Sequence, residues 1–408
     1  MECSVKSKEK YGKTYAACFL GIANQAVVTN ITAVLFVPFM LLYGFKFWQL
    51  GVLAGINFAS QIVADCIMTA IIDKVPFRPI LIVASALSAA GLVFYGLTPF
   101  IFPVRHIYAG IIAATTVFAF SSGMCEVALS PIIDNIPDSK NKNTAMSLFH
   151  SFYAWGQVLC IVITSVYLLI LKAENWNYIL FFWAVMPIAA LIFSLTAPLH
   201  KRAAEKSAKD VRKTLFSPFY IIALLAILCG AASEVFMNQW ASTFIYNLGL
   251  GKAAADLLGM CMFAVFLGIG RLLYAAFGNK INVNIALMFG SLFTAVLFIM
   301  TGVINNPVLN VVFCMLCGFT TSLLWPGTLV AASKKFPQAG AWMFAALAIA
   351  GDIGAGVSPA AAGFIADAAG FNLTFFIISI FPIIALLCHL YLFKNRRSEA
   401  AAPLDIEN

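Results

Sequence analysis

The run TYAACFLGIANQAVVTNITAVLFVPFMLLYGF, residues 14–45, lies between Lys13 and Lys46 and contains no charged side chain. A helix of about 20 mostly apolar residues crosses the ~30 Å hydrocarbon core of a bilayer. Uncharged runs also separate Arg105 from Glu126 and Lys213 from Glu234. Across the chain 62% of residues are apolar and 10% are charged, whereas soluble domains carry about 25% charged residues. The sequence therefore excludes a soluble globular domain and predicts an all-α integral membrane protein.

Motifs of soluble enzymes are missing from this sequence. It contains no H-E-x-x-H, no G-x-S-x-G and no G-x-x-x-x-G-K-[ST] pattern, so we predict no enzyme and no use of ATP. Nearly all of the ten cysteines lie in apolar runs, where packing is their expected role. Cys314 and Cys317 have the spacing of a redox or metal pair, but packing is favoured there too. We expect no cofactor, no metal and no nucleic-acid partner.

Breaks at charged residues, Pro and Gly divide the apolar runs into twelve predicted spans. The spans cover 15–42, 48–72, 79–101, 107–133, 144–171, 177–198, 217–246, 253–277, 282–304, 307–333, 340–366 and 372–393. The first run is much longer than the apolar core of a signal peptide, so the first span is expected to be retained. Trp325-Pro326 in the tenth span indicates either a bend in that helix or simple packing.

Lysines and arginines are distributed unevenly between the loops. With the N-terminus inside, 20 of the 25 fall on the cytoplasmic side and 4 outside, and Arg271 lies within a span. Because cytoplasmic loops are enriched in Lys and Arg, both termini are predicted to be cytoplasmic. We expect a multi-pass protein of the cell (plasma or inner) membrane, monomeric in the lipid bilayer.

An internal repeat indicates two related halves. Aligning Asp73-Lys74 with Asn279-Lys280 places Asp65 on Arg271, so each half has one ionisable residue at the same depth of its second span. The longest polar interior segment follows the sixth span. We predict an N-terminal six-helix half at 1–199, a cytoplasmic linker at 200–217, a C-terminal six-helix half at 218–395 and a cytoplasmic tail at 396–408.

The loop Asp73-Lys74-Val75-Pro76-Phe77-Arg78 resembles the signature loop of the major facilitator superfamily, with Thr69 and Pro76 where that pattern has glycines. Glu126 in the fourth span and the segment FHSFYAWGQ, residues 149–157, resemble the fucose-permease-like proton:sugar symporters. The resemblance implies a major facilitator fold with spans one, four, seven and ten around a cavity. It also implies a role for Glu126 in proton and sugar handling. Those permeases carry a span-one Asp, where this chain has Asn24, Gln25 and Asn30.

Two ionisable residues lie at matched depth in neighbouring spans. An ionisable side chain at the centre of a span costs at least ~2.5–3.5 kcal/mol, so such residues usually face a cavity or a partner. Glu126 and His150 are each about eight residues, or roughly 12 Å, from the same end of the fourth and fifth spans. We predict that they contact each other and couple transport to protons. The alternative is a structural pair that pins two helices.

Polar and aromatic residues in three spans could bind a polyhydroxylated solute. Glu234 and Asn238 share one helix face at i and i+4. Carboxylates and amides bond hydroxyl groups, and aromatic rings stack on the C–H face of a sugar. The predicted substrate-binding set is Glu234, Asn238, Gln239, Trp240, Asn24, Gln25, Asn30, Trp155 and Gln157. The alternative is a polar seam that holds helices together.

A further group of charged residues is assigned to gating. Asp65 and Arg271 lie in the cytoplasmic halves of their spans, where ion pairs could break and re-form. Asp352 lies in a segment rich in small residues, which permits close helix contact and favours gating over ligand contact. The gating set is Asp65, Asp73, Arg78, Arg271 and Asp352.

Three functions are compatible with this sequence. The favoured one is a secondary active transporter that moves a small polar solute, a sugar, by alternating access coupled to a proton gradient. Sodium is less favoured because the sequence has no dense Asp/Asn cluster. The alternatives are a proton-coupled efflux antiporter for amphipathic compounds and a transporter-like sensor that moves no solute.

Overall fold

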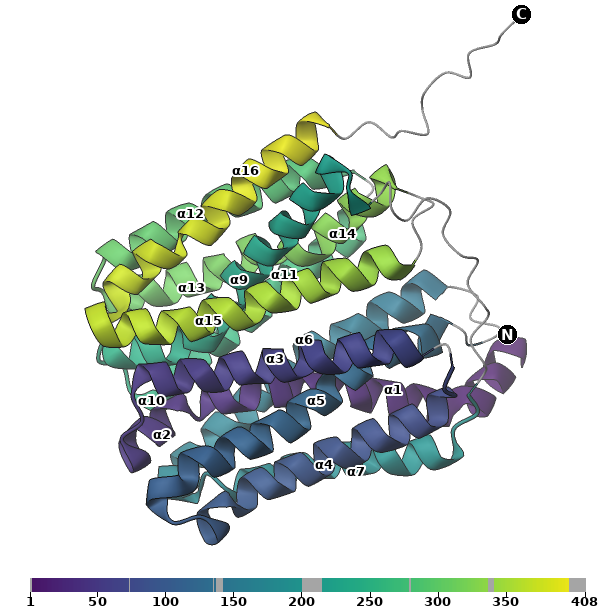
Figure 1. Ribbon diagram of the computed structural model, residues 1–408, viewed down its shortest axis with the longest axis horizontal. Coiled ribbons are helices and arrows are strands. Elements are labelled where there is room, and N and C mark those ends of the chain that lie inside the picture. The colour runs from purple at the N-terminus through teal and green to yellow at the C-terminus, as the bar shows by residue number, and fades with distance from the viewer. Residues whose placement is uncertain are drawn as a thin grey trace, which may run out of the picture.

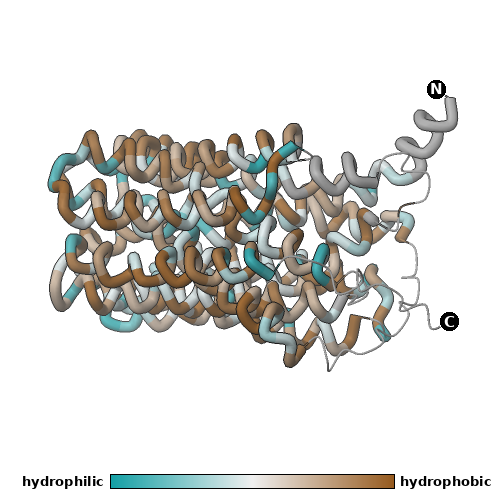
Figure 2. The backbone as a smooth tube through the Cα atoms, turned by 90° about the horizontal axis from the view of Figure 1, so that it is seen from above, coloured by the Kyte–Doolittle hydropathy of each residue, from teal (hydrophilic) through white to brown (hydrophobic). Residues whose placement is uncertain are grey.

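The structure is a computed structural model that describes residues 2–72, 74–134, 136, 142–199, 215–278, 280–336 and 341–395. The side chains of residues 2–10, 134, 142–148, 150, 275 and 341 are excepted. All regular structure in these ranges is helical. Figure 2 shows that apolar residues predominate along the helices, as expected for a protein whose solvent is lipid.

The helices of the N-terminal half follow the predicted spans closely. They are α1 (Glu2–Val34), α2 (Phe36–Tyr43), α3 (Phe47–Ile71), α4 (Phe77–Ile101), η1 (Val104–His106), α5 (Ile107–Asp134), α6 (Lys142–Leu171), η2 (Ala173–Asn175) and α7 (Tyr178–Thr196). The first span consists of α1 and α2, which break at Leu35. Pro38 has no N–H to donate to the Val34 carbonyl, so the continuous helix ends there.

The C-terminal half contains several composite spans. Its helices are α9 (Pro218–Asn247), α10 (Lys252–Ala254), the π-helix η3 (Ala255–Cys261), α11 (Met262–Phe277), α12 (Val283–Val303), α13 (Pro307–Thr321), α14 (Leu324–Lys335), α15 (Ala341–Ile378) and α16 (Ile380–Lys394). The tenth span breaks between α13 and α14, so the structure favours a bend near Trp325-Pro326 over simple packing, the two alternatives that the sequence left open. Pro326 removes the N–H that would bond the carbonyl of Ser322.

The number of spans depends on one glycine. Eleven continuous stretches of the described chain are long and apolar enough to cross a membrane, and the last, Trp342–Lys394, has 53 residues. At 1.5 Å per residue it would be about 80 Å long, well beyond the ~30 Å core. Gly370, with φ of +78°, interrupts this stretch and divides it into two spans. The described chain therefore has twelve spans, and the prediction of an all-α, twelve-helix membrane fold is confirmed.

The two halves lie side by side in Figure 1, and α3 and α15 run next to each other at the boundary. A second contact between the halves joins α6 to η3 and α11. We call the end of the bundle where α1 begins and α16 finishes the terminal end, and the opposite end the far end. Because the chain reverses at each span, α3 and η3 begin at the far end and α15 begins at the terminal end.

Contacts between the halves close the far end. The carboxylate of Asp367 on α15 accepts hydrogen bonds from the backbone N–H groups of Phe47 (3.1 Å) and Trp48 (2.8 Å). It thereby caps the N-terminus of α3, where free N–H groups and the helix dipole favour a negative charge. At the second contact between the halves, where α6 meets η3, Ser165 of α6 donates a hydrogen bond to Asp256 of η3 at 2.7 Å. Asp256 is also paired with Lys252.

We expect Gly354→Ala to destabilise the protein. A Cβ atom at Gly354 of α15 would lie 2.0 Å from the carbonyl oxygen of Leu228 on α9, so the two helices would have to separate. Overpacking of this kind costs about 1–3 kcal/mol. Gly12→Ala is the matched control, since nothing lies within 4 Å of a Cβ there. Thermal melting in detergent should show a lower midpoint for Gly354→Ala alone, and equal midpoints for both variants would contradict this packing.

Candidate functional site

A cavity of about 1120 Å³ lies between the two halves. Its lining residues extend from Asn238 and Phe263 in the middle of the bundle to Ile72 and Trp342 at the terminal end. Since the halves meet at the far end, the cavity reaches the terminal end alone. Its size is at the upper end of the range for small-molecule sites.

Most of the residues predicted for substrate binding, proton coupling or gating line this cavity. Those that line it are Gln25, Asp65, Glu126, Trp155, Gln157, Glu234, Asn238, Gln239, Arg271 and Asp352. Aromatic side chains make up much of the remaining wall, including Tyr153, Trp325 and Trp342. Amides and charges therefore face the same space as aromatic rings.

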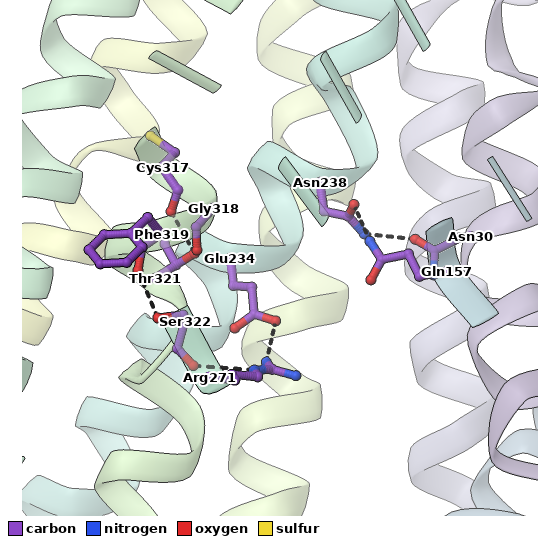
Figure 3. Close-up of polar contacts among 10 residues, drawn as sticks. All are labelled: Asn30, Gln157, Glu234, Asn238, Arg271, Cys317, Gly318, Phe319, Thr321 and Ser322. Atoms are coloured by element: carbon purple, nitrogen blue, oxygen red, sulfur yellow. Dashed lines mark hydrogen bonds and ion pairs between the residues drawn. The ribbon is translucent and has the colours of Figure 1, made fainter. Parts of the chain in front are cut away.

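Amide side chains from both halves meet at the inner end of the cavity and form what we call the amide belt: Asn30, Gln157, Asn238 and Gln239. Gln157 of α6 donates to the side-chain oxygen of Asn238 at 2.7 Å, and Asn238 of α9 donates to Asn30 of α1 at 2.7 Å (Figure 3). Gln239 donates to the carbonyl of Thr29 at 3.1 Å. Each of these bonds crosses between the N-terminal and C-terminal halves.

An ion pair lies one helical turn from the belt. Arg271 of α11 donates to Glu234 of α9 at 2.9 Å and, through Nε, to the carbonyl of Ser322 at 3.2 Å (Figure 3). That carbonyl is the one left free by Pro326, so the bend in the tenth span supplies a partner for the arginine. Arg271 thus binds within its own half, and its partner is Glu234 rather than Asp65.

Three lining carboxylates form what we call the acidic triad: Asp65 of α3, Glu126 of α5 and Asp352 of α15. One oxygen from each lies within 4.8 Å of the others. At an effective dielectric constant near 20, two negative charges at that distance repel by about 3.5 kcal/mol. A proton or a cation must therefore reduce the charge of the triad. Gln25 donates to Glu126 at 2.9 Å.

A glycine lets two of these helices approach. A Cβ atom at Gly123 of α5 would lie 2.5 Å from the carbonyl of Gln61 and 2.9 Å from Oδ1 of Asp65. Only a residue without a side chain fits there. Because Glu126 is three residues further along α5, this close contact brings it to Asp65.

Two residues predicted for the substrate site point elsewhere. Asn24 donates to Ser88 at 2.8 Å inside the N-terminal half. Trp240 is fully buried and donates to the carbonyl of Pro359 at 3.1 Å. Neither lines the cavity, and the fully buried Asn30, although it belongs to the amide belt, does not line it either. Asn24 and Trp240 each lie on a cavity helix, but on a face that packs against neighbouring helices.

Three other predicted residues are not brought into the cavity by the described contacts. Arg78 donates to the carbonyl of Ala197 at 2.8 Å, within the N-terminal half. Asp73 lies outside the described residues, and so does the side chain of His150, although its backbone belongs to α6. The expected contact between Glu126 and His150 therefore stays a prediction.

The sequence reasoning missed Asp256 and Asp367, which join the halves at the far end. Lys252 lies four residues before Asp256, and this i, i+4 spacing on a helix was an available signal. No comparable signal marks Asp367, because its partners are backbone groups more than 300 residues away in the chain.

Comparison with known proteins places this arrangement in a family. The family model described as Major Facilitator Superfamily matches residues 17–351 and 257–408. An uncharacterised MFS-type transporter from Yersinia pestis is 25% identical over 266 residues, which are 64% of this chain and 67% of the relative.

Solved structures share the fold at low sequence identity. A bacterial homologue of the human lysosomal transporter Spinster, inward-facing and occupied, has a TM-score of 0.78 at 13% identity over 96% of this chain and 99% of its own. For the nucleoside transporter NupG the TM-score is 0.73, at 12% identity, over 93% and 100%. The E. coli fucose:proton symporter FucP has a TM-score of 0.62 at 16% identity over 94% and 99%. With the family match over most of the chain, these likenesses show that this protein belongs to the Major Facilitator Superfamily of membrane transporters.

Proposed function

We propose that this protein is a secondary active transporter that moves a small polyhydroxylated solute, a sugar, by alternating access coupled to a proton gradient. The observation that carries the proposal is the amide belt at the inner end of the cavity. Gln157 and Asn238 come from different halves and bond each other at 2.7 Å. A solute that takes over these bonds would be recognised by both halves at once, as alternating access requires.

The cavity wall suits a solute with both hydroxyl groups and an apolar face. Tyr153 and Trp155 of α6 lie on the wall next to Gln157, and Trp325 lies across from them in the other half. Aromatic rings offer stacking surfaces for C–H groups, while amides and carboxylates bond hydroxyls. The bacterial sugar symporter FucP shares the fold, which is compatible with this substrate class.

Proton coupling is assigned to Glu126 and the rest of the acidic triad. A proton neutralises part of the charge that the three carboxylates concentrate within 4.8 Å. With both termini on the cytoplasmic side of the cell membrane, as the Lys and Arg distribution favours, the cavity faces the cytoplasm. The triad would then receive or release its proton on that side. A single chain contains the whole cavity, so we propose a monomer.

A proton-coupled efflux antiporter for amphipathic compounds is the second candidate. The observation that favours it is the combination of aromatic walls with four lining carboxylates and, among described residues, Arg271 as the single lining Lys or Arg. Such a surface also suits an amphipathic cation. The two candidates differ in substrate and in the direction of coupling, so one assay separates them.

Reconstituted protein should accumulate at least one monosaccharide when the outside of the vesicle is acidic. Uptake of a labelled monosaccharide panel into proteoliposomes, with and without a pH gradient, measures this. A protonophore should abolish accumulation, because the gradient supplies the free energy. Failure to take up any sugar, together with gradient-driven export of cationic dyes, would replace the first candidate with the second.

Gln157→Ala and Asn238→Ala should each raise the KM for the transported solute by about tenfold, the usual loss for one hydrogen bond of about 1.4 kcal/mol. Asn247→Ala is a matched control on the same helix as Asn238, since Asn247 bonds the carbonyl of Thr243 within α9. Initial uptake rates over a range of solute concentrations measure KM. An unchanged KM in both belt variants would remove the amide belt from the binding site.

Glu126→Gln should abolish concentrative uptake but keep exchange of labelled for unlabelled solute across the membrane. The amide has nearly the same shape as the carboxyl group but cannot carry a proton through the cycle. Accumulation and counterflow in the same proteoliposomes measure the two activities. Glu174→Gln, at an exposed position, controls for loss of an acidic residue. Normal accumulation by Glu126→Gln would show that another group carries the proton.

A further inference from the structure

The acidic triad contains more acceptor atoms than the described residues supply with donors. Asp65 and Asp352 are 4% and 3% exposed. No donor among the described residues bonds either oxygen of Asp65 or Oδ2 of Asp352. The two carboxyl groups contact each other and can bond only through a shared proton or a cation. Unsatisfied buried oxygens are costly, so a site with several of them is suited to a positively charged ligand.

A neutral side chain adds a further free oxygen beside the triad. Gln25 of α1 is 5% exposed, and its Nε2 donates to Oε2 of Glu126 at 2.9 Å. This bond holds the amide against the triad. Its Oε1 is buried and receives no hydrogen bond. A proton bound to the triad would not need the Gln25 oxygen as an additional partner. A metal cation, in contrast, binds several oxygen ligands at once.

The dimensions of the cluster fit a metal ion of moderate size. Hard cations the size of calcium bind oxygens at about 2.3–2.6 Å, so ligands on opposite sides of the ion lie roughly 4.6–5.2 Å apart. The three carboxylate oxygens all lie within 4.8 Å of one another, so a single ion of this size can contact all three. Sodium has nearly the same ionic radius as calcium. Magnesium prefers shorter distances of about 2.0–2.1 Å and an octahedral shell.

We propose that Asp65, Glu126, Asp352 and the amide oxygen of Gln25 form a binding site for a sodium-sized monovalent metal cation, which competes with protons for the same carboxylates. These four side chains supply one oxygen each, short of the 6–8 ligands that calcium takes, and the adjoining cavity leaves space for water to complete a smaller shell. A singly charged ion also leaves the site more readily than a divalent one, as a transport cycle needs.

Among the described residues, other charged groups around the site do not supply the missing positive charge; the side chain of His150, which we predict to contact Glu126, lies outside them. Among the described residues that line the cavity, Arg271 is the only Lys or Arg, and it is bound to Glu234. Tyr153 of α6 lies within electrostatic reach of Glu126 but can give no cation. The charge of the triad is therefore available to an ion from solution.

The ion would join the two halves. Asp65 and Glu126 belong to the N-terminal half and Asp352 to the C-terminal half, so the complete ligand set exists only while α3 and α15 are adjacent here. A ligand that binds one conformation better shifts the population towards it. This consequence rests on the proposed function, whereas cation binding itself does not.

Binding of radioactive sodium to the purified full-length protein in detergent tests the proposal. We expect saturable binding that approaches about one ion per chain and is stronger at pH 8.5 than at pH 6, because protons occupy the carboxylates at low pH. Sodium should also raise the melting temperature relative to N-methylglucamine at equal ionic strength. Absence of saturable binding at both pH values would overturn the proposal.

Asp65→Asn and Asp352→Asn should each weaken sodium binding by roughly tenfold or more, because each removes a charged ligand. Melting curves of the variants in N-methylglucamine identify any variant that fails to fold. If one of the two fails, sodium binding by the other variant tests the site. The matched control is Glu174→Gln, which removes an exposed carboxylate outside the cavity lining and should keep sodium binding. Undiminished sodium binding in both Asp variants would overturn the proposal that these carboxylates form the site.

Two further outcomes separate this site from the proposed function. If calcium but not sodium binds and stabilises the protein, the assignment to a monovalent ion is wrong. If sodium binds as expected but no sugar is accumulated on a proton or sodium gradient, the cation site stands and the proposed sugar transport fails.

Discussion

Polar groups inside a membrane protein find few partners in lipid, and this constraint organises the interior of the bundle. Water does not reach the hydrocarbon core, so amides, carboxylates and broken helix ends must satisfy one another. Gln157, Asn238 and Asn30 do so across the boundary between the halves. Arg271 bonds Oε1 of Glu234 and the carbonyl that Pro326 leaves free. The pairing stays incomplete at several described positions, and the acidic triad, which adjoins the cavity, is one of them.

The fold could be predicted from the sequence because each span is marked by residues within it or next to it. Long uncharged runs, basic loops and Pro or Gly breaks are local signals, and they gave the spans and marked Trp325-Pro326 as a candidate bend. Which residues line the cavity was also largely foreseen, since Glu234 and Asn238 lie on one helix face. Asn24 and Trp240 show the limit of this reasoning. They lie on the same cavity helices but point into packed faces, and rotation about a helix axis cannot be read from polarity alone.

Pairings between distant spans could not be predicted. Asp65, Glu126 and Asp352 are far apart in the sequence, so no dense acidic cluster is visible there. Their meeting depends on where α3 crosses α5 and α15, which is set by small residues such as Gly123. Likewise, the repeat that aligned Asp65 with Arg271 did not predict that Asp65 would join a group of carboxylates and Arg271 an ion pair.

The cap that Asp367 places on α3 has a thermodynamic consequence. Two hydrogen bonds from backbone N–H groups to a charged carboxylate hold the far end together. The bonds are exposed to solvent, and a helix cap contributes about 0.5–2 kcal/mol, which corresponds to a factor of roughly 2–30 in a conformational equilibrium. In the empty protein the cap would therefore lower the population of the state open at the far end. A carboxylate distant from the cargo would thus help to set how often the site is presented to that side of the membrane.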